Sequence, residues 1–146
     1  MPGQPADSRA MPELQGLLSA FPNFVRYVVV GFGLMGLFLL AYTLITPWRE
    51  FTLIRAGNPA AATALMGALL GFSLPLANTI AQSSSLTDVV LWALVALGVQ
   101  VIVHIAMRLM LPQLRAAIEA GQTAAGITAG GFAACFGLIN AACLTT

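Results

Sequence analysis

Four long apolar stretches occupy most of this 146-residue chain, and they limit its possible folds more than any other feature. None of the four contains an acidic residue or a lysine, and they run over Tyr27–Ile45, Ala60–Ile80, Val89–Met107 and Ala124–Leu144. A helix rises 1.5 Å per residue, so a stretch of about 20 residues spans the roughly 30 Å hydrocarbon core of a bilayer. The sequence therefore predicts an all-α integral membrane protein, a bundle of four spanning helices.

The composition supports the same class. Hydrophobic residues make up 59% of the chain and charged residues 8%, whereas a soluble domain carries about 25% charged residues. Six basic and five acidic residues nearly balance, so no basic surface is available for a run of phosphates. Membrane lipid is an expected partner, and nucleic acid is not.

The N-terminal residues 1–23 differ from the rest and are expected to form a separate segment, followed by a membrane domain over 24–146. Residues 1–13 are polar and are predicted to be a disordered leader. Leu14, Leu17, Leu18 and Phe21 follow the i, i+3, i+4, i+7 pattern of an amphipathic helix at the membrane surface. This helix is expected to end at Pro22.

An internal repeat is visible when the chain is shifted by 64 residues. Residues 54–80 then lie over 118–144 with nine identities, among them Ile54, Gly57 and Phe72. The pattern predicts two tandem two-helix repeats, over about 24–81 and 88–146. Because each repeat contains two spans, both copies have the same membrane orientation and are parallel.

The arginines indicate the orientation. Four of them lie in or beside the connectors within the two repeats, and two precede the first span. The positive-inside rule therefore places both connectors in the cytoplasm and both termini in the periplasm. A bias of four to two also allows a dual topology.

Several short motifs carry a family resemblance: Tyr42, Thr46-Pro47, Glu50, Gly57-Asn58, Gly71-Phe72, Leu74-Pro75-Leu76, Trp92, Gln100 and Gly137-Leu-Ile-Asn140. Over about residues 24–146 the chain resembles the YjfL-like family of small bacterial inner-membrane proteins, known as domain-of-unknown-function family 350. The resemblance implies a multi-pass protein of the bacterial cell inner membrane with four spans in two tandem repeats. It implies no established activity, so no catalytic residues are carried over.

The third stretch carries a polar stripe formed by Gln100, His104 and Arg108, which are spaced at i, i+4 and i+8 and share one helical face. A polar group that faces lipid loses its water partners, so the stripe is expected to face protein or water. His104 could relay protons or bind a ligand, with Arg108 attracting an anion. In the simpler interpretation Gln100 and His104 hydrogen-bond neighbouring helices and Arg108 reaches the headgroups.

Other residues are candidates for helix contacts. Asn78 and Asn140, near the outer ends of their spans, are expected to hydrogen-bond a neighbouring helix. Small residues give the second span of each repeat a face for close packing between repeats or subunits, and the glycines concerned are Gly67, Gly71, Gly126 and Gly130.

The two connectors form the cytoplasmic surface that a soluble partner could reach. They are predicted to be short interfacial helices, with Asn58 capping the following span. In the first connector, Trp48 is expected on the apolar side, and Arg49, Glu50 and Arg55 are expected elsewhere. In the second, Arg115 and Glu119 are expected to point outward.

The function predicted from these features is non-enzymatic: an oligomeric or partner-binding membrane component, as a homo-oligomer or with another membrane or membrane-associated protein. The alternative is an oligomeric channel or transporter for a small ion or solute that uses Gln100, His104 and Arg108. The chain has no Ser/His/Asp set, acid pair or phosphate-binding loop, and no catalytic residue, cofactor or metal site is predicted.

Overall fold

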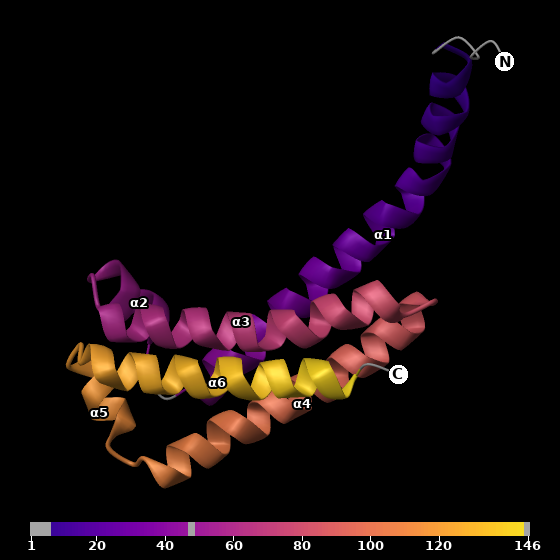
Figure 1. Ribbon diagram of the computed structural model, residues 1–146. Coiled ribbons are helices and arrows are strands. Elements are labelled where there is room, and N and C mark those ends of the chain that lie inside the picture. The colour runs from indigo at the N-terminus through magenta and orange to yellow at the C-terminus, as the bar shows by residue number, and fades with distance from the viewer. Residues whose placement is uncertain (1–6, 47–48, 145–146) are drawn as a thin grey trace, which may run out of the picture.

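The computed structural model describes residues 7–46 and 49–144, and the side chains of these residues except 7–10 and 12. This part of the chain is helical apart from short connections (Figure 1). The helices are α1 (Asp7–Ile45), α2 (Glu50–Arg55), α3 (Pro59–Gln82), α4 (Leu86–Met110), α5 (Leu114–Glu119) and α6 (Thr123–Cys143). The predicted all-α class is confirmed.

Four of the helices are long and apolar enough to cross a membrane, namely α1, α3, α4 and α6. Each contains nearly all of one of the four predicted apolar stretches. The short helices α2 and α5 occupy the two predicted connectors.

The predicted end of the first helix at Pro22 is wrong, because α1 is continuous over 39 residues from Asp7 to Ile45. The expectation of disorder also fails for residues 7–13, while residues 1–6 lie outside the described part. Proline removes one backbone donor and crowds the preceding turn, and a bend can relieve the crowding. Figure 1 shows α1 curving through its N-terminal half, away from the other helices.

Helices α3 and α6 lie side by side and run in the same direction (Figure 1). Near their beginnings, the Asn58 amide donates to the carbonyl of Ile118 at 2.7 Å. Near their ends, the Asn78 amide donates to the carbonyl of Ala141 at 2.9 Å. The two bonds show that the helices are parallel and in a fixed register.

Helix α3 also packs against α4 and α1, so the core forms where these three helices meet. The Phe38 and Phe72 rings stack there with centroids 4.5 Å apart. Buried alanines of α4 and α6, including Ala93, Ala96 and Ala133, surround them. Small side chains allow the helices to approach closely, which is the main source of packing energy between helices in lipid.

The two short helices are followed by the same turn. Gly57 and Gly121 have φ angles of 80° and 74°, which a glycine adopts at little cost. The next amide N–H in each turn bonds back to a carbonyl five residues earlier, Asn58 to Leu53 and Gln122 to Ala117. The Asn58 side chain also accepts a hydrogen bond from the Ala61 N–H at 3.0 Å, so the predicted cap of α3 is confirmed.

Candidate functional site

The polar stripe of α4 passes from the interior of the helix cluster to its edge. Gln100 is completely buried, His104 is half-buried and Arg108 is exposed. The three side chains are one turn apart, so α4 presents them on the face that packs against its neighbours. The stripe thus meets protein at one end and a cavity at the other.

Gln100 is held between α3 and α6. Its amide nitrogen donates to the carbonyl oxygen of Ala133 at 3.0 Å. The backbone at Gly71 approaches the same amide so closely that a Cβ there would overlap it. The amide oxygen of Gln100 is buried, and no hydrogen-bond partner for it is found among the described residues.

His104 makes one local hydrogen bond and one aromatic contact. Its Nδ1 lies 2.7 Å from the carbonyl oxygen of Gln100 and donates to it, because a carbonyl oxygen only accepts. The imidazole also meets the ring of Tyr42 edge-on, with centroids 5.0 Å apart and planes at 81°. The contact joins the stripe of α4 to the end of α1.

At this end of α1 lies a polar cluster formed by Tyr42, Thr46 and Glu50. The Thr46 hydroxyl lies 2.9 Å from the Tyr42 carbonyl oxygen and 3.1 Å from the Glu50 carboxylate. The Tyr42 hydroxyl also donates to the Glu50 carboxylate. Glu50 was expected away from the apolar side of the first connector, and the structure buries it: it is 2% exposed, because these two hydroxyls replace part of the water around its carboxylate.

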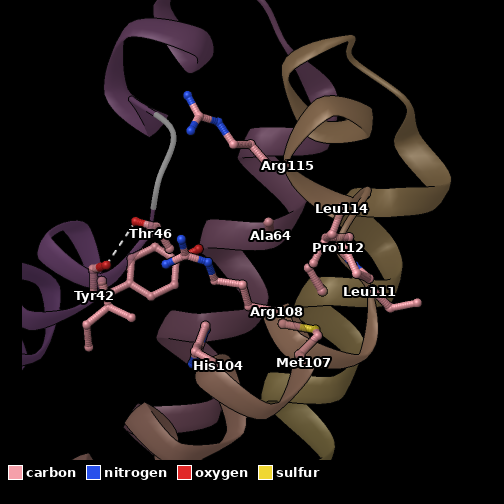
Figure 2. A pocket seen from close by; sticks show the side chains of 12 residues that line it. Tyr42, Thr46, Ala64, His104, Met107, Arg108, Leu111, Pro112, Leu114 and Arg115 are labelled. Carbon is pink, nitrogen blue, oxygen red and sulfur yellow. Dashed lines mark hydrogen bonds between the residues drawn. The ribbon is translucent and has the colours of Figure 1, made fainter.

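A cavity of about 130 Å³ separates this cluster from the end of α4 (Figure 2). Its polar wall is formed by Tyr42, Thr46, His104, Arg108 and Arg115. In Figure 2 the side chain of Arg108 extends toward Tyr42 and Thr46, and the side chain of Arg115 lies apart from it. The cavity therefore combines two cationic groups with hydroxyl and imidazole groups.

The predicted helix-contact residues lie largely between α3 and α6. A Cβ at Gly67 would overlap the backbone of Gly130, and one at Gly126 would overlap the backbone of Ala60. Asn78 bonds across to α6, as described above. Asn140 is half-buried, and the described residues offer its amide nitrogen no partner.

The predicted connector residues divide between the cavity and the outer surface. Arg115 is exposed, lines the cavity and forms an ion pair of 2.9 Å with the exposed Glu119. Arg49 and Arg55 are exposed and do not line it. Trp48 lies outside the described residues.

The polar cluster at the end of α1 was not predicted as part of the site. Tyr42, Thr46 and Glu50 have the same i, i+4, i+8 spacing as the stripe of α4. This spacing is a signal in the sequence from which the cluster could have been predicted. Pro47 lies between Thr46 and Glu50 and interrupts the helical pattern, so a shared face of the three residues was not predicted.

Groups of three or more metal-binding side chains are absent from the described part of the chain. Among the polar groups at the cavity, the guanidinium groups of Arg108 and Arg115 supply hydrogen-bond donors and positive charge. Chemically, such an arrangement suits the binding of an anion.

Comparison with known proteins places this chain in a family. The family described as Domain of Unknown Function (DUF350) matches residues 16–144. The UPF0719 inner membrane protein YjfL of Escherichia coli strain K12 is 36% identical over 129 residues, which is 88% of this chain and 98% of that protein. The protein of the same name in Escherichia coli O157:H7 matches to the same extent.

No solved structure matches the chain. The family match covers α1 from residue 16 onward, the other three apolar helices, the connectors and the cavity. The family match and the YjfL relatives together show that this multi-pass membrane protein belongs to the DUF350 family.

Proposed function

We propose that this protein is a non-enzymatic component of the inner membrane that acts by assembling with a second copy or with another membrane protein. The observation that carries the proposal is the N-terminal half of α1. At 1.5 Å per residue the 39 residues of α1 are about 58 Å long, nearly twice the thickness of the hydrocarbon core.

The projecting half of α1 carries an uncovered set of apolar side chains. Leu14, Leu17, Leu18, Phe21 and Phe24 are all more than half exposed. Of the four apolar helices, α1 is the least buried. An apolar helix that extends past its own bundle gains stability from an apolar partner, and a second copy or a neighbouring membrane protein supplies one.

A pore is less well supported. A channel needs a water-filled path, yet the mid-membrane end of the stripe is closed because Gln100 has no exposed surface. Its amide is bonded to the backbone of α6. This favours a role for Gln100 in holding helices together.

We further propose that the chain consists of two parallel tandem repeats, over about 24–81 and 88–146. The parallel pairing of α3 and α6 supports this, and so do the matching turns at Gly57 and Gly121. In this arrangement both connectors lie in the cytoplasm and both termini in the periplasm, and the arginines at the connectors support that orientation.

Extraction of the full chain in native lipid particles, followed by mass measurement, tests the assembly. We expect more than one copy, or a bound second membrane protein. Leu17→Ala with Phe21→Ala should release the partner. The matched control is Ile102→Ala with Leu109→Ala, because these side chains on α4 are at least as exposed, and it should leave the assembly intact.

A wild-type particle with a single copy and no bound protein would contradict the proposal. A flux of small ions into liposomes that His104→Gln abolishes, with assembly unchanged, would favour the channel instead.

A further inference from the structure

The cavity at the end of α4 has an unusual balance of charge for a site beside a membrane helix. Twelve residues line it, and they include Arg108 and Arg115 but no carboxylate. Its volume of about 130 Å³ is far above the ~15 Å³ that one water molecule needs on the same measure. The cavity therefore has room for a polyatomic ligand.

Two acidic groups near the cavity, Glu119 and Glu50, lie outside its lining. Glu119 pairs with Arg115 on the exposed surface, at 2.9 Å. Glu50 does not line the cavity, and it accepts hydrogen bonds from Tyr42 and Thr46. Arg108 and Arg115 are therefore the charged residues of the lining itself.

The guanidinium groups of Arg108 and Arg115 are hydrogen-bond donors of a kind that binds phosphate. Each guanidinium has five N–H groups in a planar fork, which matches the oxygens of a phosphate group. Arg108 is in the last turn of α4 and Arg115 is in the first turn of α5. At this end of a span the hydrocarbon core gives way to the headgroups, where basic pockets between helices bind anionic lipids.

We propose that this cavity binds a phosphate group, with Arg108 and Arg115 as the two cationic donors. The phosphate belongs either to the headgroup of an anionic phospholipid or to a soluble phosphate compound. The site is separate from the projecting half of α1, so the proposal stands whether or not the chain assembles through that half.

The lipid source is tested with the full chain in nanodiscs that contain phosphatidylcholine alone or with phosphatidylglycerol. Native mass spectrometry after release from the nanodisc counts the retained lipids. We expect retention of phosphatidylglycerol over phosphatidylcholine. Arg108→Gln and Arg115→Gln should each weaken retention about fivefold, because a basic residue near a membrane surface contributes about that factor.

Two further variants separate a binding role from a structural one. Arg55→Gln removes an exposed arginine that does not line the cavity, and it should retain lipid as the wild type does. Glu119→Gln frees Arg115 from its ion pair and should strengthen retention. A purely structural role for Arg115 does not predict a gain, and this variant remains informative if an arginine variant fails to fold.

The soluble source is tested by titrating inorganic phosphate against the melting temperature of the protein in a neutral detergent. Stabilisation that depends on Arg108 and Arg115, without a preference among lipids, assigns the site to a soluble phosphate compound. The proposal is overturned if neither phosphatidylglycerol nor phosphate binds. It is also overturned if the Arg108→Gln and Arg115→Gln proteins bind as the Arg55→Gln protein does.

Discussion

At the scale of single residues, the absence of a side chain is decisive where α3 meets α6. A Cβ at Gly67 or Gly137 would overlap backbone atoms of the facing helix. Gly71, Gly126 and Gly130 are constrained in the same way, whereas a Cβ at Gly131 would meet no atom within 4 Å. Close backbone contact between helices is therefore confined to particular positions.

Gly67→Ala should lower the free energy of unfolding by about 1–3 kcal/mol, because the added methyl group forces the two backbones apart. Gly131→Ala is the matched control, and it should leave stability unchanged or raise it by up to about 1 kcal/mol through better helix propensity. Unfolding by a denaturing detergent measures both values. Equal stability of the two variants would contradict the packing described here.

Thr46 is a second position at which one group matters, because its hydroxyl reaches the buried carboxylate of Glu50 at 3.1 Å. Thr46→Val keeps the shape and removes the donor, so we expect a loss of about 1–3 kcal/mol in the free energy of unfolding. Thr43 bonds only the Leu40 carbonyl of its own helix. Thr43→Val should therefore cost less than about 0.5 kcal/mol. A similar loss in both variants would argue against the Glu50 contact.

At the scale of elements, the two short helices are followed by turns with the same backbone conformation, but the side-chain hydrogen bonds at the two turns differ. Asn58 caps α3 and also donates to the carbonyl of Ile118 on α5 at 2.7 Å. Gln122 holds the matching place before α6 and makes no cap hydrogen bond. One asparagine thus connects the beginning of α3 to the second short helix.

Asn58→Ala should lower stability by about 1–2 kcal/mol through the lost cap, with a further loss from the bond to Ile118. Asn58→Asp should keep the cap but lose the bond to Ile118, since an ionised carboxylate has no hydrogen to donate. Its stability should therefore lie between those of the wild type and Asn58→Ala. Gln122→Ala is the control and should match the wild type. Thermal denaturation in a mild detergent ranks the four proteins, and a loss in Gln122→Ala equal to that in Asn58→Ala would contradict this account.

At the scale of the whole molecule, the basic residues and the four spans define an expected orientation. A reporter fused after Thr146 should be active in the periplasm, and one inserted beside Arg115 should be active in the cytoplasm. The physical reason is that arginine-rich connectors resist translocation. A cytoplasmic C-terminus would reverse the proposed orientation, and equal signals from both sides would indicate dual topology.

The sequence by itself determined the local features of this protein. The four spans, the two connecting helices and the cap at Asn58 were predictable because hydropathy, helix length and capping depend on neighbouring residues. The parallel pairing of α3 and α6 agrees in direction with the pattern shared by residues 54–80 and 118–144. The placement of Gln100, His104 and Arg108 on one face of α4 also followed from helical periodicity alone.

Only the tertiary structure decided what faces that stripe. Glu50 is charged and lies in a connector, and its local pattern did not predict burial. The hydroxyls of Tyr42 in α1 and of Thr46 directly after α1 make its burial possible. The edge contact between Tyr42 and His104 joins residues 62 positions apart. Burial depends on partners brought from distant parts of the chain, and periodicity within one helix carries no information about them.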